Sequence, residues 1–273
     1  MYQWRKGIAK WVVGNNLYIS VPFTWLVDEA NILASQWKGK VFLGGPGLMM
    51  PSTCDGFEPI LFHNPCATFT TRGCPNACPF CAVPILEGDL REIKDFRPAP
   101  VVCDNNLLAS SKAHIRRVVD SLKQFPFVDF NQGLDCDLFT SEIADMLGEL
   151  NCRVRFAFDD WDRQTAVQAA IKLCRERTTN DIRIYCLVGF NDNPTDAKAR
   201  LELVRSWGIR PTPMRFQPLD AKVKNESRGL APSWTDWEMK KMIKYYSRLV
   251  WYEAIPYEDF KWLEDQQNQG ALL

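Results

Sequence analysis

Residues 71–81 read TRGCPNACPFC and hold three of the ten cysteines of this 273-residue chain. Cys74, Cys78 and Cys81 are separated by three and then two residues, whereas the other cysteines are spread along the sequence. Soft thiolates favour iron-sulfur clusters or zinc, and three in one short loop can hold three irons of a four-iron cluster. The fourth iron then has no protein ligand. The spacing therefore predicts a metal centre with these three cysteines as ligands.

Zinc is the alternative metal for this loop. A structural zinc site needs a fourth protein ligand and normally pairs C-x2-C with a second ligand pair farther along the chain. The chain has two histidines and no second close pair of cysteines, so Cys66 or His63 would have to complete the tetrahedron. The loop is thus open to two interpretations. It belongs either to an enzyme with a reactive cluster or to a non-catalytic protein that holds an iron-sulfur cluster or zinc.

Short apolar runs alternate with amphipathic helices after residue 66. The predicted strands are residues 67–71, 100–103, 128–131, 153–158, 182–188 and 212–217. Apolar residues at helical spacing predict helices over 115–122, 143–150 and 167–174, and a fourth after Thr195. Strands that alternate with helices favour a parallel sheet with crossover connections. The sequence therefore predicts an α/β fold, a partial (β/α)6 barrel over residues 66–220.

The segments on either side of the barrel have different patterns. Residues 1–65 contain a strand-like run at 17–23, a helix around 28–36 and a strand at 40–43, which predicts a small N-terminal βαβ extension. The C-terminal segment comprises residues 221–273. A polar loop over 220–233, which we expect to be mobile, leads into it. A capping box at Thr235 then starts a C-terminal helix with an apolar face that extends to residue 250. We expect this helix to pack across the open side of the barrel.

The cysteine motif, with Phe80 directly before its last cysteine, resembles the C-x3-C-x-aromatic-C signature of radical S-adenosylmethionine (radical SAM) enzymes. The resemblance implies a partial (β/α)6 barrel, a 4Fe-4S cluster and S-adenosylmethionine as cofactors. In such enzymes S-adenosylmethionine binds the open iron, and an electron cleaves it to a 5′-deoxyadenosyl radical that abstracts hydrogen from the substrate. An electron donor such as flavodoxin or ferredoxin is implied as a partner.

The residues around the motif look most like the radical SAM branch that carries Thr-Arg-Gly-Cys-Pro, which includes cobalamin-binding enzymes and methylthiotransferases. The GGP turn at 44–46 resembles the end of the cobalamin-binding domain of that branch. The Asp-x-His-x-x-Gly motif of that domain is absent, however, and only Cys54 and Cys66 precede the motif, where methylthiotransferases need three cysteines. We therefore expect residues 1–65 to be a cobalamin-binding-like remnant without cobalamin.

Polar residues follow the ends of the predicted strands, where ligands bind in parallel sheets. Together with the resemblance, this position predicts the cofactor-binding residues Phe80, Asp104, Asn105, Asn106, Gln132, Arg155, Asp159, Gly189 and Arg215. An Asx-rich turn explains 104–106 equally well. For Arg155 the alternative is a structural ion pair with Asp135 or Asp159. A plain turn at Gly189 and strand alternation at Arg215 are also open, and no catalytic side chain is predicted.

The net charge of the chain does not indicate which class of partner the protein binds. Lysine plus arginine number 33 and aspartate plus glutamate number 33, so no net field attracts nucleic acid or an anionic membrane. No stretch of about 18 uncharged apolar residues is present. We expect a cytoplasmic protein without a membrane partner. The substrate stays open between a small molecule, a nucleoside or RNA, and a peptide.

Overall fold

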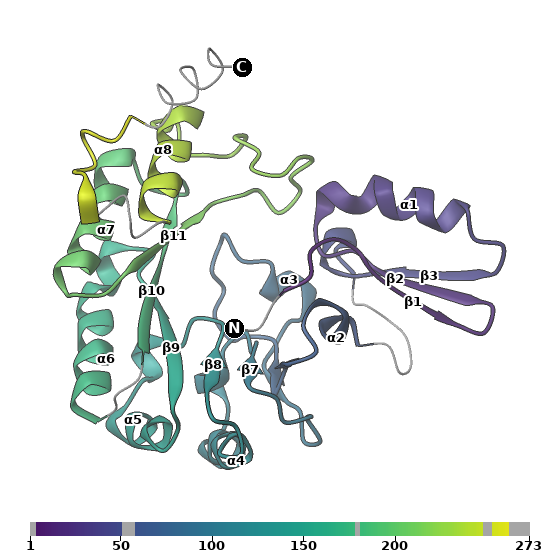
Figure 1. The fold of residues 1–273 in the computed structure, drawn as a ribbon, viewed down its shortest axis with the longest axis horizontal. Coiled ribbons are helices and arrows are strands. Elements are labelled where there is room, and N and C mark those ends of the chain that lie inside the picture. The colour runs from purple at the N-terminus through teal and green to yellow at the C-terminus, as the bar shows by residue number, and fades with distance from the viewer. Residues whose placement is uncertain (1–3, 51–57, 178–180, 248–252, 262–273) are drawn as a thin grey trace.

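The structure, a computed structural model, describes residues 4–50, 58–177, 181–247 and 253–261. Two sheets lie side by side along the long axis of the molecule, a large one within a ring of helices and a small one formed by the N-terminal residues (Figure 1). None of the helices in the described ranges combines the length and the apolarity needed to cross a membrane.

The large sheet has six strands in the order β11-β10-β9-β8-β7-β4, and every neighbouring pair is parallel. All six strands predicted from the apolar runs are confirmed, although the first two are short. Their bounds are β4 (Ala67–Thr68), β7 (Val101–Val102), β8 (Val128–Phe130), β9 (Cys152–Ala157), β10 (Asp181–Val188) and β11 (Pro211–Arg215). The open, six-stranded parallel sheet is the predicted partial barrel.

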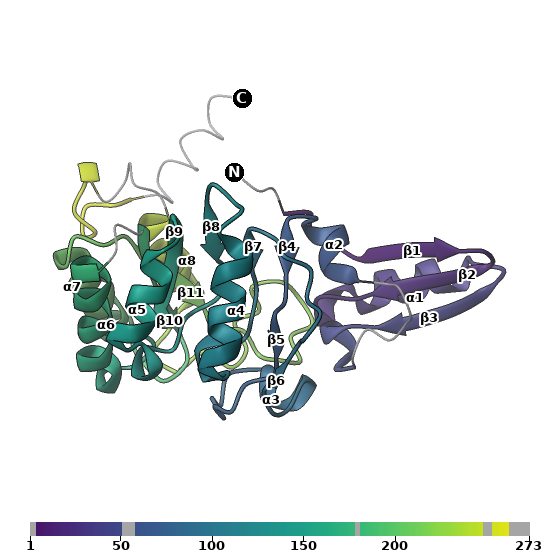
Figure 2. The same ribbon diagram turned by 90° about the horizontal axis from the view of Figure 1, so that it is seen from below.

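Helices connect the strands and cover the outer face of this sheet (Figure 2). They are α4 (Lys112–Leu122), α5 (Ser141–Gly148), α6 (Gln164–Arg177) and α7 (Pro194–Ser206). The side chains of Ser111, Thr140 and Asn193 cap the first turns of α4, α5 and α7. Their apolar stripes pack on alternate strand residues such as Val154 and Phe156 to form the main core. The predicted helical stripes are therefore confirmed.

The C-terminal helix α8 (Asp236–Tyr246) begins at the predicted capping box of Thr235 and Glu238. Its position differs from our prediction. Met239 and Met242 are fully buried in the main core, and α8 packs beside α7 and β11. It therefore covers the outer face of the edge strand rather than the open side of the barrel. The part of its predicted apolar face at 249–250 lies outside the described residues.

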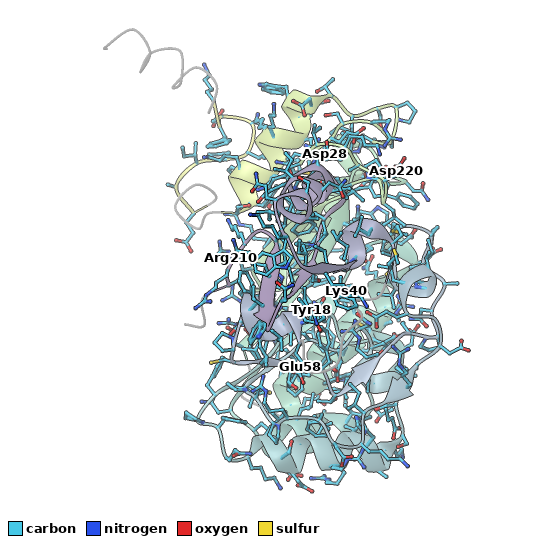
Figure 3. The ribbon with its side chains drawn as sticks, turned by 90° about the vertical axis from the view of Figure 1, so that its right-hand side faces the viewer. Tyr18, Asp28, Lys40, Glu58, Arg210 and Asp220 are labelled. Atoms are coloured by element: carbon cyan, nitrogen blue, oxygen red, sulfur yellow. The ribbon has the colours of Figure 1, made fainter. Side chains whose placement is uncertain are left out.

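The small sheet is formed by β1 (Ala9–Val13), β2 (Asn16–Ser20) and β3 (Lys40–Gly44). The predicted βαβ unit is confirmed as β2, α1 (Val27–Ser35) and the parallel strand β3. The sequence analysis missed β1, which pairs antiparallel with β2 across a two-residue turn at 14–15. Gly14 takes a positive φ of 58° there, as primed hairpin turns require. In Figure 3 the unit is seen end-on, with Asp28 on α1 and with Tyr18 and Lys40 on the strands below it.

Two contacts tie the small sheet to the barrel. After β3 come the short turn η2 (Pro46–Leu48) and α2 (Pro59–His63), and the backbone nitrogen of Arg5 donates to the carbonyl of His63 over 2.8 Å. On the other side, the Thr24 hydroxyl in the turn η1 (Thr24–Leu26) donates to the carbonyl of Ala221. The N-terminal unit thus contacts both the β4 edge and the loop that follows β11.

Candidate cluster and cofactor site

The cysteine motif lies in the connection between β5 (Thr71–Arg72) and β6 (Arg91–Glu92), an antiparallel pair just past the carboxyl end of β4. The backbone nitrogen of Cys74 donates to the carbonyl of Gly88 over 3.2 Å, and that of Cys81 donates to the carbonyl of Cys78 over 3.0 Å. A short helix, α3 (Val83–Leu86), follows the third cysteine. The loop is therefore held by its own backbone before any metal binds.

The cysteine sulfurs accept hydrogen bonds from nearby N–H groups. The Cys74 Sγ accepts from the backbone nitrogen of Asn76 over 3.4 Å and from Asn106 Nδ2 over 3.6 Å. The Cys81 Sγ accepts from the backbone nitrogen of Val83 over 3.5 Å. Such donors stabilise thiolates, and hydrogen bonds to sulfur tune iron-sulfur potentials. These sulfurs therefore suit the charged, metal-bound form.

The three thiols act on one another electrostatically. Burial raises the pKa of Cys78, and the neighbouring Cys81, Cys74, Asp159 and Asp135 raise it further. Burial also raises the pKa of Cys81, with a smaller contribution from Cys74. A bound iron core reverses this balance because metal coordination deprotonates thiols outright. The negative surroundings of the loop thus fit a cationic metal centre.

Glu87 fastens the first half of the motif to the neighbouring loops. Its Oε2 accepts from the backbone nitrogen of Gly73 over 2.9 Å and from Asn105 Nδ2 over 2.8 Å, while Oε1 pairs with Arg72. Gly73 has a φ of 78°. A methyl group at this position would lie 2.2 Å from the carbonyl oxygen of Asp89. The turn into Cys74 therefore requires glycine.

Asp104 holds the residues just before the motif. Its carboxylate accepts from the backbone nitrogen of Thr71 over 2.9 Å and from both the backbone nitrogen and the hydroxyl of Thr70. Only 3% of Asp104 is exposed. The structure thus places this predicted cofactor-binding side chain against the backbone of the β4–β5 segment. These contacts span more than 30 residues of sequence, so they are not those of an Asx turn that caps the next helix, and the cofactor-binding role of Asp104 stays a prediction.

We expect the free energy of unfolding of the protein to depend on pH through the titration of Asp104. Burial raises the pKa of Asp104 to about 6, against the hydrogen bonds from Thr70 and Thr71 that lower it. The folded state therefore binds more protons than the unfolded state, whose aspartate pKa is about 3.9. This contribution to stability is present below about pH 4 and is lost as the pH rises through about 6, a change on the order of 2–3 kcal/mol.

Urea unfolding at several pH values checks this expectation. Asp104→Asn has no titratable group at this position. Between about pH 4 and pH 7 the unfolding free energy of the wild type should therefore fall relative to that of the variant. Asp95→Asn is the matched control because Asp95 is exposed. Parallel pH profiles for wild type and Asp104→Asn would contradict the expectation.

Asn106 connects the second strand to the cluster loop and to the third strand. Its Nδ2 lies 3.6 Å from Cys74 Sγ and 3.3 Å from Asp135 Oδ2, and the same carboxylate oxygen accepts from Asn76 Nδ2 over 2.9 Å. Burial alone would raise the pKa of Asp135, but hydrogen bonds from Asn76, Asp137 and Asn106 lower it. Asn106 is 3% exposed, and its Oδ1 has no hydrogen-bond partner among the described residues. The structure therefore leaves one buried acceptor beside a cluster cysteine.

Phe80 links the motif by ring contacts to the residues that follow β10 and β11. Its ring meets that of Phe190 edge-on, with centroids 5.4 Å apart, and Phe190 meets Phe216 at 4.9 Å. Phe190 follows β10 and Phe216 follows β11. The aromatic row thus connects the loop after the first barrel strand with the ends of the last two.

Asp159 and Gln132 follow their strands as predicted. The Asp159 Oδ1 accepts from the backbone nitrogen of Leu187 over 2.7 Å, and burial raises the pKa of Asp159. The charge of Asp159 also contributes to the raised pKa of Cys78. Gln132 is exposed. Their cofactor-binding roles stay predictions.

Arg155 forms an ion pair inside the barrel, and its cofactor-binding role stays a prediction. The side chain is 9% exposed, and its Nη1 and Nη2 pair with the two carboxylate oxygens of Asp129 on β8. Nη1 also donates to the carbonyl of Phe130 over 2.8 Å. The alternative of a structural ion pair is therefore right, but its partner is Asp129 rather than Asp135 or Asp159. A charge buried in an apolar strand needs such a partner.

Arg215 and Gly189 are also engaged by the protein itself. Arg215 Nη2 donates to the carbonyl of Asn225 over 2.9 Å and to Ser227 Oγ over 3.1 Å, so it fastens the loop after β11. Gly189 has a φ of 95°, and a methyl group there would meet Met239 Cε at 2.5 Å and Leu230 Cδ2 at 2.8 Å. The close approach that glycine allows is to α8 and its preceding loop. The cofactor-binding roles of both residues stay predictions.

Sequence reasoning did not assign site roles to Asn76, Glu87 and Asp135. Each is a polar residue in a loop, which is where solvated residues are commonest, so composition alone could not separate them. Position offered one signal, since Asp135 follows the third strand and Asn76 lies between two cysteines. Asp135 accepts from both Asn76 and Asn106, and Glu87 accepts from Asn105, and these contacts appear only in the folded chain.

The two residues proposed as a fourth zinc ligand lie elsewhere. His63 Nδ1 lies 3.1 Å from the carbonyl oxygen of Arg5, and Cys66 packs beside Ala67, Val101 and Cys103. In the part of the chain that the structure describes, no three His, Cys, Asp or Glu side chains gather as a ligand set for a single metal ion, and this includes the three motif cysteines.

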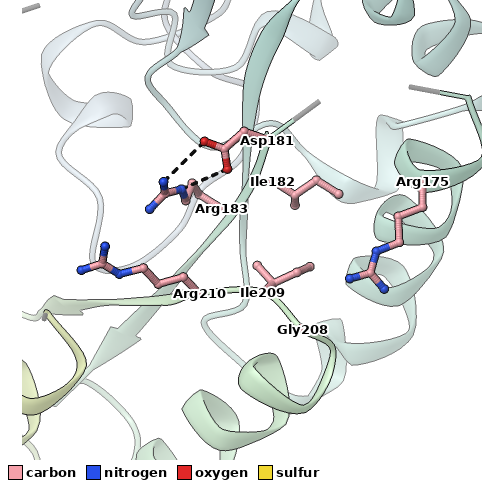
Figure 4. Close-up of a pocket in the computed structure, with 7 residues that line it drawn as sticks. All are labelled: Arg175, Asp181, Ile182, Arg183, Gly208, Ile209 and Arg210. Carbon is pink, nitrogen blue, oxygen red and sulfur yellow. Dashed lines mark hydrogen bonds and ion pairs between the residues drawn. The ribbon is translucent and has the colours of Figure 1, made fainter. Parts of the chain in front are cut away.

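Several hollows lie outside the mouth of the barrel. One of about 550 Å³ separates the small sheet from β4 and α3, and Arg72 and Glu87 form its wall toward the motif. A second, of about 370 Å³, lies at the amino ends of β10 and β11 (Figure 4). Its arginines are already bonded: Arg183 to Asp181, Arg210 to the carbonyl of Ser247, and Arg175 to that of Trp207. The arginines of this second hollow therefore bind other groups of the protein.

Solved structures provide the comparison with known proteins. One is TsrM from Kitasatospora setae, a radical SAM methyltransferase with cobalamin and a 4Fe-4S cluster bound. It is 14% identical with a TM-score of 0.44, over 56% of this chain and 35% of that one. Another is coproporphyrinogen III oxidase, HemN, from Escherichia coli, a radical SAM enzyme that is 14% identical with a TM-score of 0.42, over 60% of this chain and 42% of that one.

Both neighbours are radical SAM enzymes. The present chain spans less than half the length of either neighbour, and at this identity the likeness concerns the fold alone. No protein-family model and no curated protein matches the chain. The roles of individual residues therefore depend on the site geometry and on the motif.

Proposed function

We propose that this protein is a radical SAM enzyme whose Cys74, Cys78 and Cys81 hold a 4Fe-4S cluster. The observation that carries the proposal is the loop itself. The sulfurs of Cys74 and Cys81 accept hydrogen bonds from Asn76, Asn106 and Val83, and backbone hydrogen bonds hold the loop at Cys74 and Cys81. When bound, the cluster and S-adenosylmethionine supply a 5′-deoxyadenosyl radical that takes a hydrogen atom from the substrate.

The chain's own residues would then orient the cofactor. Asn106 Oδ1 is a buried acceptor without a partner among the described residues, and it suits the amino group of S-adenosylmethionine. Asn105 is held by Glu87 at the same loop, and Asp159 follows the fourth barrel strand and contributes to the raised pKa of Cys78. Phe80 closes the loop against Phe190, which narrows access of water from that side. Gln132 lies exposed at the rim.

The electron needed for the chemistry would come from a flavodoxin- or ferredoxin-type donor. The substrate is not identified by these residues. The competing proposal is a non-catalytic iron-sulfur or zinc protein, which would hold metal in the same loop but would not cleave S-adenosylmethionine.

Anaerobic reconstitution separates these proposals. The chain is supplied with iron and sulfide, then with dithionite and S-adenosylmethionine, and 5′-deoxyadenosine is measured by chromatography. We expect cluster absorbance and 5′-deoxyadenosine above a control without dithionite. A cluster without cleavage would favour the non-catalytic iron-sulfur protein, and tightly bound zinc without cluster absorbance would favour the zinc protein.

A further inference from the structure

The side chain of Asp135 lies between the end of the third barrel strand and the cysteine motif. Its neighbours in the chain, Leu134 and Cys136, are both buried. The backbone nitrogen of Leu134 donates to the carbonyl of Arg155 on β9 over 2.7 Å. The Asp135 side chain is 10% exposed. Its position is therefore set by buried neighbours and by a backbone bond to the next strand of the sheet.

Four donors among the described residues converge on this carboxylate. Oδ2 accepts from Asn76 Nδ2 over 2.9 Å and from Asn106 Nδ2 over 3.3 Å. Oδ1 accepts from the backbone nitrogen of Asp137 over 3.2 Å and from Arg163 Nη2 over 3.2 Å. One oxygen is thus held by its own turn and by the arginine, and the other oxygen binds the two amides.

Both of these asparagines also donate to the sulfur of Cys74. Asn106 Nδ2 lies 3.6 Å from Cys74 Sγ, and the backbone nitrogen of Asn76 donates to the same sulfur over 3.4 Å. In the described part of the chain, Asp135 therefore holds both residues whose N–H groups reach this sulfur. The carboxylate is separated from the sulfur by one amide group.

The carboxylate also determines the orientation of the Asn106 amide. An ionised carboxylate accepts hydrogen bonds and cannot donate them, so the amide must present its nitrogen to Asp135. The amide oxygen, Oδ1, is then left buried without a partner among the described residues. An amide in place of the carboxylate could donate to Oδ1 and stabilise the reversed orientation. The free acceptor of Asn106 thus depends on the charge state and chemistry of residue 135.

We propose that Asp135 is a positioning residue for the cluster and for S-adenosylmethionine. It holds Asn76 and Asn106 on the sulfur of Cys74, and it keeps Oδ1 of Asn106 free for the amino group of S-adenosylmethionine. Its negative charge also disfavours the addition of an electron to the cluster, because net charge and hydrogen bonds to the sulfurs set cluster potentials. This inference rests on the proposed function, since both groups belong to it.

Equilibrium dialysis of labelled S-adenosylmethionine against the reconstituted full chain, without dithionite, tests the positioning role. Asp135→Asn should weaken binding about three- to tenfold, the order of one hydrogen bond. Asn106→Ala should weaken it by a similar factor. In the double variant, Asp135→Asn should add little to the loss from Asn106→Ala, because the first residue acts through the second. Fully additive losses would overturn the proposal.

The midpoint potential of the cluster is the second readout, because a residue that only supported the fold would not shift it in a fixed direction. Asp135→Asn should raise the potential, measured by redox titration with electron paramagnetic resonance, since a nearby negative charge is lost. Asp137→Asn is the matched control. Asp137 binds the same Arg163, but its side chain is 57% exposed, so solvent screens its charge. It should change neither the potential nor the binding of S-adenosylmethionine.

Iron analysis and thermal unfolding show whether each variant is loaded and folded. If Asp135→Asn fails either check, Asp135→Ala takes its place, because it removes the same charge and acceptor, and the same two changes are expected. The two proposals fail separately. A wild-type chain that binds no cluster or no S-adenosylmethionine would contradict the proposed function. A loaded wild type whose Asp135 variants behave like Asp137→Asn would contradict only the role of Asp135.

Discussion

Cys78→Ala is expected to remove the cluster and with it the cleavage of S-adenosylmethionine. Cys78 is the middle ligand of the motif, and the pKa values show that its thiol interacts with those of Cys74 and Cys81. Loss of a residue that only supports a metal ligand costs about 10–100-fold in affinity, and loss of a ligand costs more. Iron and sulfide per chain should therefore fall to background, and 5′-deoxyadenosine should fall at least about 100-fold.

Cys66→Ala is the matched control for this variant. Cys66 is partly buried like the motif cysteines, but it packs with Ala67, Val101 and Cys103. Its removal should leave iron content and 5′-deoxyadenosine at wild-type levels. If Cys66→Ala also loses the metal, Cys66 is a ligand and the zinc alternative gains support. If Cys78→Ala retains the cluster, the ligand assignment is wrong.

Gly73→Ala should prevent cluster assembly although all three cysteines are intact. At a φ of 78° the added methyl group would lie 2.2 Å from the carbonyl oxygen of Asp89 and 2.7 Å from that of Gly88. Both are backbone atoms, so the β5–β6 connection must move. Left-handed backbone costs a further 1–2 kcal/mol, approximately, for any residue with a Cβ. We expect iron incorporation after reconstitution to fall about tenfold or more, in line with these two costs.

Gly88→Ala separates the two costs. Gly88 has a φ of 65° in the same connection, but a methyl group there meets nothing within 4 Å. This variant carries the backbone cost without the collision, so it should lose roughly 1–2 kcal/mol of stability and still assemble the cluster. Iron analysis and thermal unfolding of both variants give the comparison. Equal iron incorporation by Gly73→Ala and Gly88→Ala would show that the close approach to Asp89 does not matter.

The barrel could be predicted because its signals are local. Apolar runs bounded by polar turns located all six strands, and helical spacing located the helices between them. The capping box at Thr235 begins α8 where the sequence places it. The strand β1 was missed because its side chains are largely exposed and it gains its place by pairing with β2. The position of α8 was wrong because its apolar face did not specify which surface it would cover.

The site divides in the same way. The sequence by itself was enough to predict the three cysteines as metal ligands, since their spacing lies within eight residues and needs no distant contact. Only the tertiary structure decided which polar residues face them. Asn106 and Asp135 meet the motif, whereas Arg155 is taken by Asp129, and Arg215 is taken by the loop after β11. The physical reason is that a buried charge or amide binds whichever partner the fold brings within reach, and that partner is set by strand order and packing rather than by the neighbouring sequence.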